Sequence, residues 1–330
     1  MQKEIDSICF VFNKDGTITG AWSKTPVFKF NSKLYKNKHK IDHRQCFFAE
    51  NENCSVYISL EKCGIEFIVK IILRDKKLNG TAVDCIVKKY LLNKKDIPNL
   101  LNERVYFEDK KIKIALTSQQ SSKHIRCQFN DFAGYDNLYL DLTFIRQQSE
   151  SLNLSLPFEY SDKNFYYKAF SPMINISGNI KLGDNQYIFS DSTGYCDSTN
   201  YNLPFRQIYR CVTANCNING KDFALYFGSK LGDDLVGEEN CYFSDGKIKK
   251  LSKIKFLGTD ERIDKIWNFK AGIKAVDVIF KPEFYKDTPV FAKCDKTTIV
   301  YGKLYGEFNL LNSDSVNLNE IPAQMIFTVI

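Results

Sequence analysis

Hydrophobic and polar residues alternate along most of the chain with a period of two, which is typical of half-buried β-strands. In the first half, the pattern runs through residues 56–60, 65–71, 112–116, 138–144 and 152–156. Asn, Asp, Gly or Lys residues bound each of these runs and supply the chemistry of tight turns. The pattern therefore predicts a series of antiparallel strands.

The second half repeats this pattern with stronger turn signals. Gly183-Asp184-Asn185, Asn219-Gly220 and Asp245-Gly246 each separate two alternating runs, as expected of β-hairpins. Later runs at 276–280 and 298–308 complete the set. Each half carries enough strands for one barrel. We therefore predict an all-β fold of two antiparallel β-barrel domains, at 1–165 and 166–330.

Helical patterns are few. The segments 82–93 and 97–103 are compatible with short amphipathic helices, and equally with a strand followed by a turn. The prediction is therefore of few short helices.

Composition narrows the class of protein. The 330 residues are 44% hydrophobic and 26% charged, as in ordinary folded domains. There is no apolar run of the roughly 18 residues that a membrane span needs. The opening MQKEIDSICF lacks the pattern of a signal peptide, which favours a cytoplasmic location. The 11 cysteines include no CxxC pair, so we expect reduced core residues and no metal site.

The net charge of +7 comes from lysines that are interleaved with Asp and Glu. The one locally basic segment, KLYKNKHKIDHR from Lys33 to Arg44, has no accompanying nucleic-acid-binding motif. We therefore interpret it as a solvated loop and expect no nucleic-acid partner.

Three segments resemble a known bacterial family, the domain of unknown function 2804. They are LNLSLPFEYSDKNFYYKAFSPMINISGNIKLGDNQYIFS, GYCDSTNYNLPFRQIYR and LGDDLVGEENCYFSDGKIKKLSKIKF. FNKDGTITGAWSKTPVFKFN, WNFKAGIKAVDVIFKPEF and YGKLYGEFN also resemble that family, so the likeness covers most of the chain. The family is similar to AttH-like proteins, hydroxyneurosporene synthase and fungal Diels–Alder-type pericyclases. The resemblance implies two lipocalin-like barrels, side by side, with a small-molecule pocket in or between them.

The resemblance also shows where this chain departs from the family. Ser198-Thr199-Asn200 replaces a frequent Gly-Arg-Gly, and Ile208-Tyr209-Arg210 stands where the family usually has a Trp-rich strand. These differences predict a more polar pocket than a large, flat, hydrophobic ligand would need.

Asp197 is the candidate catalytic residue. A carboxylic acid at the mouth of an apolar barrel can be held protonated by desolvation and can then act as the acid of a hydratase or cyclase. The alternative is an Asp that caps a turn in an irregular Ser/Thr/Asn-rich loop.

Arg206 and Arg210 are the candidate ligand-orienting residues. Their spacing of four places both on one face of a strand, where they clamp an anionic group or pair with Asp197 or Glu239. Tyrosines flank the same segment, and aromatic rings with hydroxyl groups suit a mixed apolar and polar cavity. The tyrosines predicted to bind ligand are Tyr195, Tyr201 and Tyr209.

Glu238 and Glu239 end an acidic stretch that begins at Gly232. Two carboxylates can perform glycosidase-type acid–base chemistry or bind a hard cation. A solvated acidic loop is the alternative interpretation.

Three functions are compatible with these residues. The first is cofactor-free acid–base chemistry on a lipid-like or isoprenoid-like ligand, with Asp197 as the acid. The second is a non-catalytic carrier, and the third is a carbohydrate hydrolase that uses Asp197 with Glu238 or Glu239. The sequence contains no Gly-x-Ser-x-Gly motif, P-loop or dinucleotide fingerprint, so no cofactor is predicted.

Overall fold

The computed structural model describes most of the chain. The described residues are 3–35, 40–76, 82–93, 97–119, 121–134, 136–146, 150–158, 161–172, 175–204, 208–229, 237–251, 253–258, 262–272, 276–287, 297–309 and 315–329. At 82–87, 89, 162 and 191, only the backbone is described.

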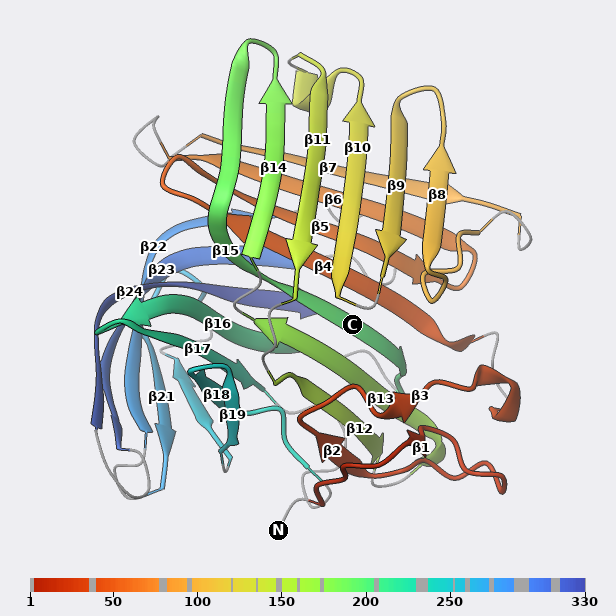
Figure 1. Cartoon of the computed structure of the whole chain (residues 1–330), viewed down its shortest axis with the longest axis vertical. Coiled ribbons are helices and arrows are strands. Elements are labelled where there is room, and N and C mark those ends of the chain that lie inside the picture. Colours follow the sequence, from red (N-terminus) through yellow and green to blue (C-terminus); the bar gives the residue numbers. More distant parts are fainter. Residues whose placement is uncertain are drawn as a thin grey trace. The chain divides into compact units, whose positions relative to one another are not determined.

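The all-β prediction is confirmed: the chain forms two curled, antiparallel half-barrel sheets (Figure 1). The segment 82–93, for which the sequence left helix and strand open, forms a strand, β7 (Ala82–Leu91). Within the described residues, helical structure is limited to two 3-10 turns, η1 (Ser32–Leu34) and η3 (Phe132–Gly134).

The chain packs into two compact units, and neither is continuous in sequence. The first unit comprises Met1–Lys36, Glu150–Tyr167 and Asn202–Ile330, and the second comprises Asn37–Ser149 and Lys168–Tyr201. The chain passes between the units at four points, one of which, 167/168, lies close to the predicted boundary at 165. The two continuous domains at 1–165 and 166–330 stay a prediction.

The second unit is built on one long antiparallel path of strands, β7-β6-β5-β4-β15-β14-β11-β10-β9-β8. Figure 1 shows β8, β9, β10, β11 and β14 side by side, with β4 to β7 crossing behind them. The remaining bounds are β4 (Asp42–Glu50), β5 (Cys54–Cys63), β6 (Glu66–Asp75), β8 (Arg104–Glu108), β9 (Ile112–Ser118), β10 (Ser122–Phe129), β11 (Leu138–Ile145), β14 (Asn175–Leu182) and β15 (Asn185–Asn202).

The long strand β15 joins the two layers of this unit. Its first half pairs with β14 and its second half with β4. Gly194 permits the close approach to β4, because a Cβ atom there would lie 1.9 Å from the carbonyl oxygen of Phe48. The core between the layers includes Phe47, Ile58, Val69 and other buried hydrophobic side chains of β4 to β6 and β8 to β11.

The first unit carries a nine-stranded path, β19-β18-β17-β16-β24-β23-β22-β21-β20. The predicted turns at Asn219-Gly220 and Asp245-Gly246 are present, and all four residues have positive φ, as a two-residue hairpin turn of this kind requires. The bounds are β16 (Ile208–Ile218), β17 (Lys221–Gly228), β18 (Cys241–Ser244), β19 (Lys247–Lys250), β20 (Lys255–Gly258), β21 (Trp267–Ala271), β22 (Val276–Asp287), β23 (Thr297–Asn309) and β24 (Ser315–Val329).

Short strands complete the first unit. β12 (Leu152–Phe158) pairs with β2 (Ala21–Ser23), and β1 (Cys9–Phe10) pairs with β3 (Phe28–Lys29). β13 (Ser161–Pro172) runs through the crossing point at 167/168.

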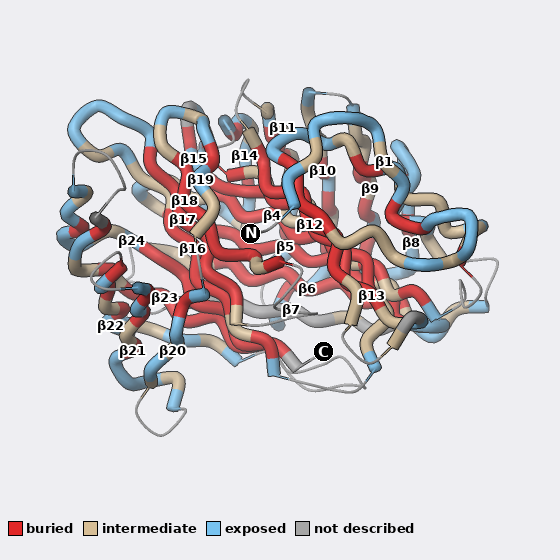
Figure 2. Tube along the Cα trace, turned by 90° about the horizontal axis from the view of Figure 1, so that it is seen from below, coloured by how far each residue is buried: buried red, intermediate tan, exposed pale blue. Residues whose placement is uncertain are grey.

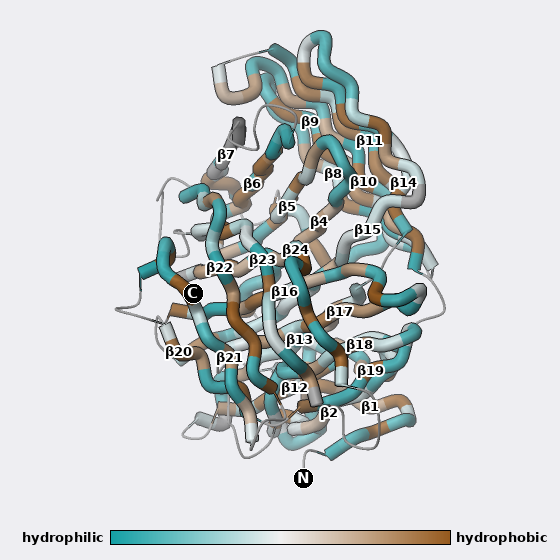
Figure 3. The backbone as a smooth tube through the Cα atoms, turned by 90° about the vertical axis from the view of Figure 1, so that its left-hand side faces the viewer, coloured by the Kyte–Doolittle hydropathy of each residue, from teal (hydrophilic) through white to brown (hydrophobic). Residues whose placement is uncertain are grey.

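In one layer of the second unit, the strands bury one face and expose the other. In the other layer, the strands bury both faces. Alternate residues are exposed along β8, and Figure 3 shows hydrophobic and hydrophilic positions alternating along β9 and β11. In contrast, nine of the ten residues of β5 are buried, and Figure 2 shows β4, β5 and β6 as largely buried strands. The face of β4 to β6 that points away from the core of this unit is therefore also shielded from solvent.

Candidate functional site

Polar and charged side chains occupy this second buried face. Directly opposite residues of an antiparallel ladder share a face. The register places Asp197 opposite Cys46, Cys46 opposite Ser59, and Ser59 opposite Lys70. We call this set the Asp197 face; it comprises Arg44, Cys46, Tyr57, Ser59, Glu61, Lys70, Lys168, Asp197 and Thr199.

Asp197 forms an ion pair with Lys168. The Lys168 Nζ atom donates to Asp197 Oδ2 at 2.6 Å, and the Thr199 hydroxyl lies 3.4 Å from Oδ1. The Lys168 side chain is only 2% exposed and that of Asp197 16%. The prediction of an irregular loop around Asp197 is wrong, because this residue lies inside strand β15. The turn-capping alternative is wrong for the same reason.

A second ion-pair network lies on the same face. Lys70 Nζ contacts both carboxylate oxygens of Glu61, at 3.0 and 3.2 Å, and Arg44 Nε lies 3.5 Å from Oε1. The Ser59 hydroxyl donates to the same carboxylate at 2.6 Å. Burial by itself raises the pKa of Glu61, but the charges of Lys70 and Arg44 outweigh burial and hold the pKa below its usual value.

Arg44 connects this network to Tyr57, whose hydroxyl oxygen lies 2.7 Å from Arg44 Nη2. Burial raises the pKa of Tyr57 well above its ordinary value, so this hydroxyl is neutral. Sequence reasoning missed Arg44, Glu61, Lys70 and Lys168. One signal was available: Lys70 interrupts the otherwise apolar run Phe67–Leu73, and a lysine there must be paired when the strand is buried.

Two predicted ligand-binding tyrosines are packed into the second unit. The Tyr195 ring lies 5.3 Å from Phe48 and 5.4 Å from Phe170 between ring centroids, so it forms part of an aromatic cluster. Tyr201, near the end of β15, is also buried.

At the start of β4, two titratable side chains are shifted by burial. The His43 Nδ1 atom lies 2.5 Å from Asn200 Oδ1, and burial lowers the pKa of His43 to about 4. Burial raises the pKa of the adjacent Asp42 to about 6, although the Gly64 backbone N–H donates to its Oδ1 at 3.0 Å.

The first unit contains a separate polar group, the Glu239 cluster, which comprises Tyr166, Tyr209, Tyr226, Gly228 and Glu239. The Tyr209 hydroxyl donates to Glu239 Oε2, and the Tyr166 hydroxyl lies 3.4 Å from the same oxygen. Tyr209 and Tyr226 are joined by a 2.5 Å hydrogen bond between their hydroxyl groups. Burial, reinforced by the charge of Glu239, raises the pKa of Tyr209 well above its ordinary value.

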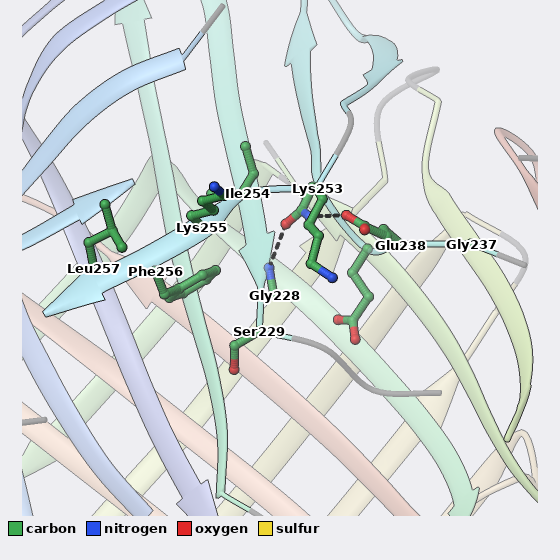
Figure 4. Close-up of a pocket in the computed structure, with 11 residues that line it drawn as sticks. Gly228, Ser229, Gly237, Glu238, Lys253, Ile254, Lys255, Phe256 and Leu257 are labelled. Atoms are coloured by element: carbon green, nitrogen blue, oxygen red, sulfur yellow. Dashed lines mark hydrogen bonds between the residues drawn. The ribbon is translucent and has the colours of Figure 1, made fainter. Parts of the chain in front are cut away.

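A pocket of about 330 Å³ borders this cluster. Figure 4 shows Ile254, Phe256 and Leu257 along one part of the lining, and Glu238 in another part. The full lining is Gly228, Ser229, Gly237–Asn240 and Lys253–Leu257. Glu238 is held in place by Asn240, whose Nδ2 donates to Glu238 Oε2 at 2.8 Å.

Of the two predicted ligand-orienting arginines, the structure describes Arg210. Arg210 follows Tyr209 directly on β16, and its guanidinium lies 5.7 Å from the centre of the Trp267 ring. Its backbone N–H donates to the Ser229 hydroxyl at 2.8 Å. Arg206 lies outside the described residues, so the predicted pairing with Arg210 stays a prediction.

The predicted site residues thus fall into two groups. Asp197, Tyr195 and Tyr201 belong to the second unit. The first unit holds Tyr209, Arg210, Glu238 and Glu239.

The described part of the chain also bears on metal binding and membrane insertion. Within the described ranges, no group of three or more His, Cys, Asp or Glu side chains is placed so that it could hold a metal ion. None of the helices in the described part of the chain is long and apolar enough to span a membrane.

Known structures with the same fold are distant in sequence. An AttH protein from Nitrosomonas europaea aligns with a TM-score of 0.54 at 10% identity, over 91% of this chain and 96% of that chain. Kievitone hydratase from Nectria haematococca gives 0.54 at 10% identity, over 100% and 97%. CghA gives 0.51 at 12% identity, over 88% of each chain. These likenesses establish the fold and confirm the resemblance to AttH-like paired barrels.

No curated protein matches the chain. A family match, in contrast, extends over residues 2–325 and confirms the family that the sequence segments indicated. The chain belongs to the family described as domain of unknown function DUF2804.

Proposed function

We propose that the protein carries out cofactor-free acid–base chemistry of the hydratase, isomerase or cyclase type on a small molecule at the Asp197 face. The observation that carries this proposal is the buried Asp197–Lys168 pair. Paired acidic and basic groups held in a shielded environment are what proton transfer requires. The fold shared with kievitone hydratase supports the same class of reaction.

The ion pair with Lys168 changes the role predicted for Asp197: in this proposal Lys168 is the acid and the Asp197 carboxylate is the base. In the hydration of a carbon–carbon double bond, the Asp197 carboxylate accepts a proton from water as the new C–O bond forms. The Lys168 ammonium group delivers a proton to the other carbon. The proton on Asp197 then returns to Lys168 across the 2.6 Å contact, so that water is consumed and the pair is restored.

The proposed ligand is a lipid-like or isoprenoid-like molecule with an oxygenated group. The Asp197 face carries Arg44, Lys70 and Lys168 against Glu61 and Asp197, so basic groups outnumber acidic ones. A partially negative oxygen on the ligand suits that balance. The ligand class itself comes from the family resemblance.

Deuterium incorporation tests the reaction in whichever direction it runs. The small molecule that co-purifies with the protein is identified by native mass spectrometry and incubated with fresh protein in D₂O. Wild type is expected to place deuterium on carbon, since each of the three reaction types protonates a carbon atom in its forward or its reverse direction. Asp197→Asn and Lys168→Met are expected to lower the incorporation rate at least 100-fold, in line with general acid–base catalysis.

Asp141→Asn is the matched control, because Asp141 also forms ion pairs but is 45% exposed. A folded Asp197→Asn protein that retains the wild-type rate would refute the proposal. A ligand recovered without deuterium from wild type would instead support the carrier function. The hydrolase alternative would need Asp197 to act with Glu238 or Glu239, and no described contact favours it.

A further inference from the structure

We propose that the pocket of the first unit is a second binding site, which takes a neutral molecule with an apolar body and one hydroxyl group. The hydroxyl would donate to Glu239. This inference goes beyond the reaction proposed above and does not depend on Asp197.

The pocket has the size and lining of a small-molecule site. Its volume of about 330 Å³ lies within the range of ligand pockets. Ile254, Phe256 and Leu257 contribute an apolar wall from β20 and the residues before it (Figure 4). Ile254 is already buried, so an apolar ligand body would remove Phe256 and Leu257 from water and gain free energy from the area it buries.

Glu239 supplies the hydrogen-bonding group of the pocket. This residue lines the pocket and is only 3% exposed. Two tyrosine hydroxyl groups, from Tyr209 and Tyr166, converge on its Oε2 atom and fix the orientation of the carboxylate. An ionised carboxylate only accepts hydrogen bonds, so the complementary ligand group is a donor such as a hydroxyl.

The half-buried ammonium group of Lys250 favours a neutral ligand over a cation. Lys250 Nζ donates to the Glu238 carbonyl oxygen and lies 5.7 Å from the centre of the Trp22 ring. Burial lowers the pKa of Lys250 to about 8, and the neighbouring Cys241, Glu239 and Glu238 side chains oppose that shift. Since this lysine already offsets the charge of Glu239, a cationic ligand would gain little further attraction.

The lack of a side chain at Gly228 leaves the room in which the Glu239 carboxylate borders the pocket. A Cβ atom at this position would lie 2.8 Å from both Glu239 Oε2 and the Tyr209 hydroxyl oxygen. Gly228 does not have the left-handed φ that favours glycine, so the residue is required for room rather than for backbone conformation. Any side chain here would press on the carboxylate that the ligand is proposed to reach.

Binding of 1-naphthol and naphthalene to the full-length protein tests the proposal. The two probes share an apolar body and differ by one hydroxyl group. By isothermal titration calorimetry, 1-naphthol is expected to bind at least tenfold more tightly than naphthalene. Glu239→Gln should remove most of that preference and leave naphthalene affinity unchanged. Glu108→Gln, the control, removes a carboxylate of the second unit that does not line the pocket and should retain the preference.

A pocket-filling variant protects the test against misfolding of the Glu239 variant. Leu257→Trp adds bulk at a lining residue that is 46% exposed and should abolish binding of both probes. Asp197→Asn should bind 1-naphthol like wild type, which separates this proposal from the catalytic one. Equal affinity for the two probes, no binding of either, or unchanged binding in Leu257→Trp would each overturn the inference.

Discussion

Lys70→Met is expected to destabilise the second unit strongly, because it leaves the Glu61 carboxylate buried without its main partner. Lys70 Nζ contacts both oxygens of Glu61, and the Lys70 side chain is 1% exposed. Loss of one member of a buried ion pair costs about 3–5 kcal/mol. Arg44 remains 3.5 Å from Glu61 Oε1, so we expect about 3 kcal/mol, near the lower limit.

Urea unfolding of single and double variants measures this coupling. Glu61→Gln alone should cost a similar amount, because it leaves the lysine buried. The double variant Lys70→Met/Glu61→Gln should then cost at least about 2 kcal/mol less than the sum of the single changes. Lys113→Met is the control: Lys113 pairs with Glu108 at 2.7 Å but is 55% exposed, so it should cost less than about 1 kcal/mol.

The pH dependence gives an independent check. The pKa of Glu61 is lower in the folded protein than in the unfolded chain, where a glutamate has a pKa near 4.3. The contribution of Glu61 to stability is therefore fully present above about pH 4.3 and is lost as the pH falls through the folded pKa. Lys70→Met should weaken this acid-dependent loss. A cost for Lys70→Met no larger than that of Lys113→Met, with an unchanged acid limb, would refute the reasoning.

Three further predictions concern the same unit. Burial raises the Asp42 pKa to about 6, so the ionised carboxylate destabilises the folded protein at pH 7.5. In urea titrations, Asp42→Asn should raise the free energy of unfolding by about 1–2 kcal/mol at that pH, and the gain should vanish below pH 4. Burial lowers the His43 pKa to about 4, so the contribution of His43 to stability should fall as pH drops from 6.5 towards 4, opposite in sign to that of Asp42. In thermal unfolding scans, the stability of His43→Gln relative to wild type should therefore rise over this range. Gly194→Ala should cost about 3 kcal/mol in urea unfolding, since its Cβ would meet the Phe48 carbonyl oxygen at 1.9 Å; a cost under about 1 kcal/mol would contradict the close packing.

The fold was largely predictable because turn chemistry and alternation are local signals. The Asn219-Gly220 and Asp245-Gly246 turns appear where their residue types require positive φ. The segment at 82–91 was ambiguous, because a short apolar run fits either a strand or a helix. Pairing with β6 decides it, and such pairing is a long-range contact that periodicity does not encode.

The site was predictable only in part. The sequence identified Asp197 and Glu239 but described the first as a loop residue, since Ser, Thr and Asn dominate its neighbourhood and favour turns. Ladder pairing with β4 overrides that local preference. Lys168 was missed for a different reason: lysine is rarely buried, and nothing in the local sequence shows that its partner lies 29 residues away.

The buried charges of the Asp197 face are an argument for chemistry rather than for stability. Well-packed hydrophobic residues often stabilise a protein as much as a buried ion pair does, because removing charges from water costs several kcal/mol per ion. Strands β4 to β6 already bury a hydrophobic face against the core, so their other face could have been apolar as well. Instead it holds Lys70 against Glu61 and lies in register with Asp197, which pairs with Lys168. Burying two such ion pairs carries a desolvation cost. A role of these groups in proton transfer or ligand orientation would explain why they are buried despite that cost.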